Sequence, residues 1–296
     1  MNIIYRPKEY CKEYAEISCG QLPQLIAVRK GLKPVIDELE TFIDQRAKEL
    51  LDEEKITNLH SKVSFDQRYG LLLKQSSEVG YGMDIMHMRK PAMFAFLGNS
   101  NLLDTIEPLI GPEIVCSPIQ HVRAKPPSSH GNSSWSHGVP WHQDAAVMMK
   151  EAEGTNAVTC WIPLSQSTVE NGCLQIIPNS GKLGYLRHQK EGGTTVVPEL
   201  MPKEASISLE CRRGDIILLN RFIIHSSLPN QSDRCRWSLD LRYQPIGQHT
   251  GRTAHPNFVV RSQRHPDHIL TNYDQWCHMW TDAFEHPRGH AGHRTD

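Results

Sequence analysis

The sequence predicts a mainly β protein in which helices flank a β-sandwich or barrel, and three features support this fold class. Residues 1–95 carry apolar side chains three and four positions apart, the spacing of amphipathic helices. Residues 96–250 carry short apolar runs separated by turn residues, which is typical of strands. Residues 251–296 return to loop and helix. We interpret these regions as parts of one domain covering residues 1–296, because a chain of this length can build one large core.

The helical flanks follow from apolar stripes and stop signals. One stripe runs from Leu22 to Ile43 and continues into the charged segment 47–55. A Gly-Pro pair at 111–112 ends a shorter apolar stretch, as such pairs commonly end helices. Near the C-terminus, Trp276 and Trp280 lie four residues apart, so one helix face can pack against the β-structure. The predicted helices are residues 22–55, 64–75, 102–110 and 273–284.

The strands are expected where short apolar runs lie between turn residues. The predicted strands are residues 114–125, 139–149, 155–163, 173–178, 206–209, 215–220 and 237–243. A Ser/Gly-rich loop, residues 128–138, directly precedes the second of these strands. We interpret this loop as either a mobile lid over a site on that strand or a solvated linker.

Composition argues against several other classes of protein. The chain has 32 Lys and Arg against 33 Asp and Glu, and it shows no basic stripe of the kind that nucleic-acid binding requires. No apolar stretch approaches the roughly 20 residues that span a bilayer. The eight cysteines include no C-x-x-C pair and follow no secretory signal. We therefore expect reduced thiols, a cytoplasmic location, and no nucleic-acid or membrane partner.

An H-x-D motif on the second predicted strand, His142 and Asp144, is the central chemical feature. Side chains alternate along a strand, so these two point to one face and Gln143 points to the other. Two histidines and one carboxylate hold Fe(II) in non-haem oxygenases and leave positions open for O2 and a bidentate co-substrate. The motif supplies two of these three ligands, and the third must come from elsewhere in the chain.

A distant histidine and an arginine complete the pattern. His225 lies at the end of an apolar stretch, and Arg236 follows eleven residues later at the start of a predicted strand. The planar guanidinium of an inward-facing arginine can bind a carboxylate through two hydrogen bonds, which lysine cannot reproduce. Taken alone, His225 could be a packed core residue and Arg236 a surface ion-pair partner. Their order after the H-x-D motif favours a metal and carboxylate site.

The order of H-x-D, distant His and Arg resembles the phytanoyl-CoA dioxygenase family of Fe(II)/2-oxoglutarate-dependent oxygenases. Further segments resemble this family at residues 122–127, 161–164, 170–174 and 177–178. The resemblance covers residues 95–250 and implies a double-stranded β-helix core, the jelly roll of cupin-like proteins. One loop differs from the family pattern. Residues 178–182 stand where the family often has Pro-Gly-Ser-His, close to the entrance of the substrate pocket. The resemblance therefore does not identify the substrate.

The resemblance also implies a role for each matching position. The catalytic iron ligands would be His142, Asp144 and His225. Arg236 would bind the far carboxylate of 2-oxoglutarate, and Ser227 would assist it. Arg123 would face the pocket and contact the co-substrate or an acidic substrate, or else serve as a structural ion-pair partner. Gln143 and Trp161 would line or support the site.

The implied reaction is the oxidation, expected as a hydroxylation, of a small organic molecule by O2, while 2-oxoglutarate is decarboxylated to succinate and CO2. Asp144 favours hydroxylation over halogenation, because halogenating relatives replace this carboxylate with a small residue. His121 and Arg123 suggest an anionic or polar substrate. Two alternatives remain: a non-redox cupin-like isomerase or lyase, which would not need Arg236, and a small-ligand-binding protein on the same scaffold.

Two other groups of histidines are not interpreted as working metal sites. A second H-x-D copy, His265 to Asp267, has Pro in the middle, lies in the loop-rich tail, and is followed by no matching ligand strand. Three further histidines lie in a Gly-rich terminal stretch that we expect to fray, which favours adventitious metal binding. They are His286, His290 and His293.

Overall fold

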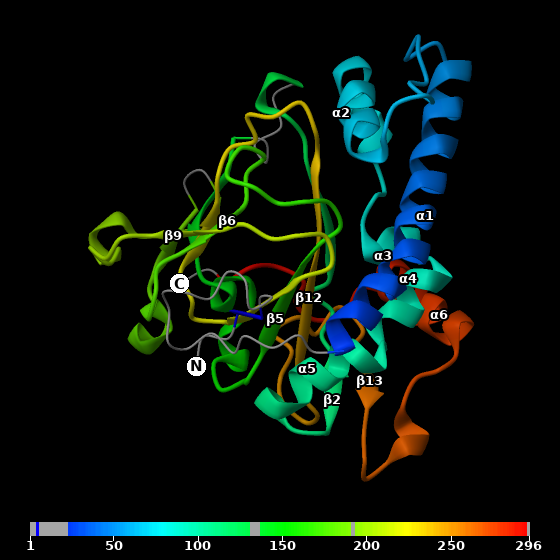
Figure 1. The fold of residues 1–296 in the computed structure, drawn as a ribbon. Coiled ribbons are helices and arrows are strands. Elements are labelled where there is room, and N and C mark those ends of the chain that lie inside the picture. Colours follow the sequence, from blue (N-terminus) through cyan, green and yellow to red (C-terminus); the bar gives the residue numbers. More distant parts are fainter. Residues whose placement is uncertain (1–3, 6–22, 131–136, 191–192, 295–296) are drawn as a thin grey trace.

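The computed structural model describes residues 4–5, 23–130, 137–190 and 193–294. Its helices gather mostly on one side of the β-structure (Figure 1). The α-helices are α1 (Pro23–Asp52), α2 (Phe65–Gln75), α3 (Ile85–Met88), α4 (Pro91–Leu97), α5 (Ser100–Ile110) and α6 (Tyr273–Glu285). The four helices predicted from apolar spacing are confirmed, whereas α3 and α4 are too short for periodicity to reveal. None of the helices in these ranges is long and apolar enough to cross a membrane.

Two antiparallel sheets form the core. The larger sheet has the order β1 (Ile4–Tyr5), β10 (Ile216–Asn220), β5 (Val158–Pro163), β12 (Arg236–Pro245), β2 (Ile114–Cys116) and β13 (Phe258–Arg261), and β3 (His121–Lys125) also pairs with β12. The smaller sheet has the order β4 (Val139–His142), β11 (His225–Ser227), β6 (Leu174–Ile176) and β9 (Ile207–Leu209). A separate hairpin joins β7 (His188–Gln189) and β8 (Thr195–Val196). This arrangement confirms the predicted mainly β class with flanking helices and a two-sheet, jelly-roll core.

Alternation along the strands of the larger sheet produces two separate apolar layers. Trp161 and Ile217 face the smaller sheet and pack with its apolar side chains. Their neighbours Cys160 and Ile216 face the other way and pack with α1 and the other helices. The larger sheet is therefore buried on both faces, which explains why β5 and β10 contain near-continuous apolar runs.

The predicted strand 114–125 is in fact two strands, β2 and β3. Between them, residues 117–120 oppose only two residues of β12, because Cys116 pairs with Tyr243 and His121 pairs with Asp240. The Gln120 side chain fills this break, since its amide nitrogen donates to the carbonyl oxygens of Arg242 and Ser117, each at 2.7 Å. A second difference lies in the tail, where β13 forms in a region expected to contain only loop and helix.

Candidate active site

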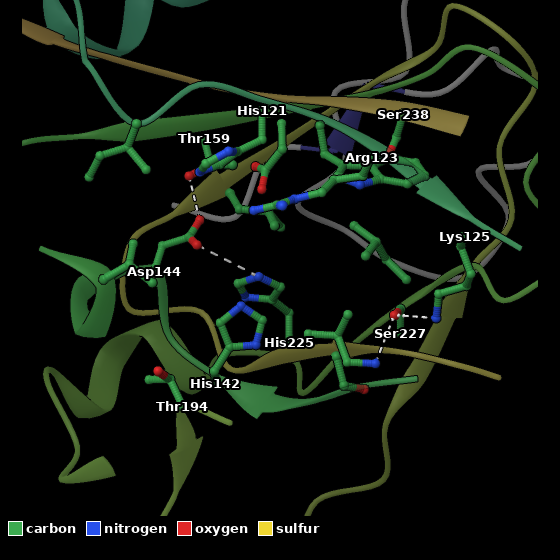
Figure 2. Close-up of a pocket in the computed structure, with 18 of the residues that line it drawn as sticks. His121, Arg123, Lys125, His142, Asp144, Thr159, Thr194, His225, Ser227 and Ser238 are labelled. Carbon is green, nitrogen blue, oxygen red and sulfur yellow. Dashed lines mark hydrogen bonds and ion pairs between the residues drawn. The ribbon is translucent and has the colours of Figure 1, made fainter. Parts of the chain in front are cut away.

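Neighbouring strands of the smaller sheet bring two histidines together. His142 ends β4 and pairs directly with His225 at the start of β11, so their ring centroids are 4.2 Å apart. Asp144 follows two residues later, and one of its carboxylate oxygens lies 4.0 Å from Nε2 of His225. The potential ligand atoms of the three residues all lie within 4.8 Å of one another. Figure 2 shows the three side chains facing one another at one end of a cavity.

The local geometry differs from the predicted strand 139–149. The strand ends at His142, and Asp144 begins a single 3-10 turn, Asp144–Val147. Gln143 keeps an extended backbone (φ −115°, ψ 139°), so the alternation continues one residue beyond the strand. Its side chain points away from the cavity and donates to the carbonyl oxygens of Gly184 and Phe222. Gln143 thus supports the turn from behind instead of lining the cavity.

Both histidines present the correct nitrogen to a metal. Nδ1 of His142 lies 2.9 Å from the carbonyl oxygen of Pro140, and Nδ1 of His225 lies 2.9 Å from that of Ile223. A carbonyl oxygen can only accept, so each Nδ1 carries the proton of its hydrogen bond and Nε2 is the nitrogen left to face a metal. Burial, together with the neighbouring His225, lowers the pKa of His142 to about 3, so its imidazole is neutral.

Asp144 is held ionised by partners that the sequence did not reveal. Arg242 donates to Oδ1 at 2.5 Å, and the Thr159 hydroxyl donates to Oδ2 at 2.5 Å. Burial alone would raise the pKa of Asp144, but Arg242 and the two histidines hold it well below its usual range. Two imidazoles and one carboxylate are a donor set that suits a divalent cation such as Fe(II).

Arg236 is a buried cation without a counter-ion. It is 3% exposed; Nη1 donates to the Ser238 hydroxyl at 2.8 Å, and the guanidinium lies 5.2 Å from the ring of Trp161. Within the described ranges, no carboxylate lies at ion-pair distance from it. Burial lowers the pKa of Arg236 to about 10, which still leaves the group charged at neutral pH. An unpaired buried charge is costly, so this position fits a bound carboxylate.

Ser227 contacts Lys125, a residue that the sequence did not single out and that pairs across the strands with Arg236. Nζ of Lys125 donates to the Ser227 hydroxyl at 2.7 Å and to the Leu228 carbonyl oxygen at 2.5 Å. Lys125 is 2% exposed, and burial with the adjacent Arg236 lowers its pKa to about 6. Alternation on β3 was the available signal, because Lys125 shares a strand face with the singled-out Arg123.

Arg123 and His121 line the same cavity from β3. Nδ1 of His121 lies 2.7 Å from a carboxylate oxygen of Asp84, whose other oxygen accepts from the backbone of Val122. Burial opposes ionisation of Asp84, but its hydrogen bond with His121 and the nearby charge of Arg123 lower its pKa overall. The structure thus brings Arg123 to the cavity, where its charge also interacts with the carboxylate of Asp84.

The cavity has a volume of about 380 Å³ and an excess of positive charge. Two lining residues are carboxylates, Asp144 and Asp240. The cationic lining residues are Arg123, Arg236, Arg242 and Arg252. In Figure 2, Ser227 and Lys125 lie along the cavity from the His-Asp-His group, while Thr194 lies on the His142 side. The charge balance favours anionic occupants.

The terminal stretch, which we expected to fray, makes defined contacts with the rest of the fold. The backbone nitrogen of Arg294 donates to the carbonyl oxygen of Ala146 at 3.2 Å, and its guanidinium lies 3.9 Å from the ring of Tyr185. His293 lines the cavity, and its Nδ1 lies 2.9 Å from the Thr194 hydroxyl. Contacts with the cavity wall, which periodicity cannot reveal, hold this tail in place. Of the predicted loop 128–138, residues 131–136 lie outside the described ranges.

The other histidine groups lack the features of a built site. The structure does place His265, Asp267 and His268 close enough to share an ion, but all three are exposed. The terminal histidines form no cluster within the described ranges, because His293 turns to the cavity wall while His286 pairs with Asp282. Only the His142, Asp144 and His225 group combines burial, fixed tautomers and a cavity among the residues described here.

Comparison with known proteins supports this interpretation of the fold. A 32% identical relative, the phytanoyl-CoA dioxygenase domain-containing protein 1 homolog of Dictyostelium discoideum, aligns over 34% of this chain and 39% of its own length. The 2-aminoethylphosphonate dioxygenase of uncultured bacterium HF130_AEPn_1 is 29% identical over 38% of this chain and 41% of its own length. The 1-deoxypentalenic acid 11-beta-hydroxylase of Streptomyces arenae is 31% identical over 43% of this chain and 48% of its own length. The chain thus spans less than half the length of these curated relatives.

Among solved structures, the apo form of the non-heme monooxygenase ThoJ has the same fold, with a TM-score of 0.55 and 17% identity, covering 83% of this chain and 86% of that one. The family model for phytanoyl-CoA dioxygenase (PhyH) matches residues 25–238, which include all three clustered ligands and Arg236. This match extends over well more than half of the chain. The chain therefore belongs to the phytanoyl-CoA dioxygenase family.

Proposed function

We propose that this protein is a non-haem Fe(II)- and 2-oxoglutarate-dependent dioxygenase that hydroxylates a small organic molecule. The observation that carries the proposal is the combination of two histidine Nε2 atoms, one ionised carboxylate and one unpaired buried guanidinium in a single cavity. Fe(II) held by the three ligands would supply the oxidising chemistry from O2 while 2-oxoglutarate is converted to succinate and CO2. The named activities of the relatives, a dioxygenase and a hydroxylase, agree with this reaction class.

Each side chain then has a defined task. His142 and His225 offer Nε2, and the carbonyl oxygens behind them fix their orientation. Arg236 binds the far carboxylate of 2-oxoglutarate, and the Ser227 hydroxyl lies on the same side of the cavity to assist it. Trp161 covers the guanidinium with its ring, which keeps water away and strengthens the ion pair.

Arg123 is proposed to contact the co-substrate or the substrate from β3, on the evidence that it lines the cavity. We also propose that residues 1–296 act as one oxygenase domain on a small-molecule substrate, without nucleic acid. A cytoplasmic location is supported by the cysteines, since the six in the described ranges are all free thiols.

The proposal is tested by anaerobic titration of Fe(II) and then 2-oxoglutarate into the apo-protein, with the visible metal-to-ligand charge-transfer band as the signal. We expect the band in the parent, its loss in His225→Ala, and a 2-oxoglutarate affinity about 100-fold weaker in Arg236→Ala, because a buried charge-assisted pair is lost. Arg234→Ala is the matched control, since Arg234 is half-exposed and pairs with Asp66 at the surface. Iron binding without any band on adding 2-oxoglutarate would favour the non-redox isomerase or lyase instead.

A further inference from the structure

A second buried guanidinium without a counter-ion among the described residues, Arg252, lines the cavity at the end away from Arg236. Arg236 and Arg242 lie on the same face of β12. They are six residues apart, which corresponds to about 20 Å along a strand. Arg252 lies at the Arg242 end, because its Nε donates to the carbonyl oxygen of Val147 in the turn that begins at Asp144. The cavity therefore has a cation at each end, with the His-Asp-His group between them near Arg242.

Arg252 lacks a counter-ion. It is 9% exposed, and the hydrogen bond from Nε to Val147, at 3.1 Å, is its only side-chain contact of this kind in the part of the chain described. Arg242, in contrast, is neutralised by Asp144 and Asp240. Burial and the neighbouring Arg242 lower the pKa of Arg252 to about 10, which is the signature of a charge that nothing nearby balances. The terminal nitrogens of Arg252 are thus available to a ligand in the cavity.

The backbone holds Arg252 firmly in this position. Gly251 has a φ of +73°, and its carbonyl oxygen accepts from the backbone nitrogen of Met149 at 3.2 Å. A Cβ at Gly251 would lie 2.7 Å from Cβ of Met148, so only glycine allows this close approach. The backbone nitrogen of Arg252 is also bound to the Thr250 hydroxyl. Such a fixed, desolvated cation needs little reorganisation to bind an anion.

We propose that Arg252 binds the anionic group of the substrate, and that the substrate is a small organic acid with an apolar body. Next to Arg252, Ile119 and Val147 pack against each other and line the cavity, which suits hydrocarbon. His293 from the terminal tail adds a polar edge at the same end, held by Thr194. A carboxylate and a phosphonate share the required chemistry, since each accepts from both terminal nitrogens of a guanidinium. This inference rests on the proposed function, because it assigns the substrate for the same metal centre.

The test uses the Fe(II)- and 2-oxoglutarate-loaded protein without oxygen and three probes of equal chain length: hexanoate, hexylphosphonate and hexanamide. Binding is read from the change in the charge-transfer band. We expect one or both anions to bind the parent about 10- to 100-fold more tightly than the neutral amide. Arg252→Met should abolish this preference and Arg252→Lys should retain part of it, whereas Arg234→Met should leave it unchanged.

Three outcomes would overturn the inference. Equal affinity of the parent for all three probes, including no detectable binding, excludes a small organic acid. An anion preference that survives in Arg252→Met assigns the anion to another cation. A weaker 2-oxoglutarate affinity in Arg252→Met, by more than about threefold, would place Arg252 in the co-substrate site.

Thermal unfolding distinguishes a structural role for Arg252 from a role in binding the anion. Removing an uncompensated cation should leave the Tm equal or higher, whereas loss of a structural side chain lowers it. If the charge-transfer band fails to form in the parent, the proposed function is wrong. The anion preference is then measured from the Tm shift that the same probes produce in the metal-free parent and in Arg252→Met. A preference that Arg252→Met abolishes supports anion binding by Arg252 independently of the proposed function, and its absence in the parent contradicts it.

Discussion

Buried cations dominate the candidate site at the scale of single residues. Arg242 is balanced by Asp144 and Asp240, whereas Arg236 and Arg252 contact no carboxylate within the ranges that the structure describes. Removing ions from water costs several kcal/mol each unless a partner compensates. Retaining two uncompensated cations in one cavity therefore fits a protein that fills the cavity with anions.

Lys125 gives a prediction about pH. Burial and the nearby Arg236 lower its pKa to about 6, whereas the unfolded chain has a lysine pKa near 10.5. Between these values the unfolded chain binds one more proton, so the free energy of unfolding should rise with pH, by up to about 1.4 kcal/mol per pH unit. Lys125→Met lacks this contribution. We therefore expect the parent to gain stability relative to Lys125→Met as the pH rises from 7 to 9, measured by urea unfolding.

The control for this experiment is Lys62→Met, since Lys62 is exposed and its removal should leave the pH dependence of the parent unchanged. A stability difference between parent and Lys125→Met that is constant over this range would mean that Lys125 stays protonated in the folded protein.

Sequence patterns revealed the candidate ligands but not the residues that support them. His142 and Asp144 were recognisable because an H-x-D motif is local, and Arg236 because its spacing from His225 is fixed along one stretch of chain. The partners Arg242 and Lys125 share strand faces with Arg236 and Arg123, so alternation placed them near the site. Their importance depends on pairing with residues about a hundred positions away, which spacing cannot reveal.

At the scale of elements, the break between β2 and β3 shapes the metal end of the cavity. Four residues oppose two residues of β12 at this point, and one of the two is Arg242, whose guanidinium binds Asp144. The Gln120 amide replaces the missing strand-to-strand hydrogen bonds. The sequence predicted one uniform strand over 114–125. Apolar periodicity does not reveal that residues 117–120 include two more residues than the opposite strand, with the Gln120 side chain filling the break.

Gln120→Ala should therefore destabilise the fold. Gln120 is 2% exposed, and its loss leaves the Ser117 carbonyl oxygen without its amide donor and the Arg242 backbone nitrogen without its acceptor in a buried site. The Arg242 carbonyl oxygen still accepts from the Ser117 backbone nitrogen at 3.0 Å. We expect the free energy of unfolding to fall by roughly 3 kcal/mol in urea titrations, since each buried unsatisfied group costs about 1–3 kcal/mol. Gln45→Ala, on the exposed face of α1, should change it by less than about 0.5 kcal/mol. A cost below about 1 kcal/mol for Gln120→Ala would show that strand pairing alone holds the break.

At the scale of the whole molecule, the cavity joins the two sheets. The candidate ligands His142 and His225 belong to the smaller sheet, whereas Arg236 and the partners of Asp144 belong to the larger sheet. The mainly β class and the flanking helices were predictable because they depend on local periodicity. The way in which the tail returns to the cavity, and which strand faces meet across it, depend on long-range packing and were not.

Because 2-oxoglutarate would contact both sheets, its binding should stabilise the whole fold. A ligand at 100 times its Kd that binds only the folded state adds about 2.7 kcal/mol to the free energy of unfolding. We expect this gain when 2-oxoglutarate is added anaerobically at constant, saturating Fe(II), which removes the contribution of iron bound to unfolded histidines and cysteines. Arg236→Met should lose most of the gain at the same ligand concentration, whereas Arg234→Met should keep it. An equal gain in the parent and in Arg236→Met would mean that Arg236 does not hold the co-substrate, even if the metal centre is correct.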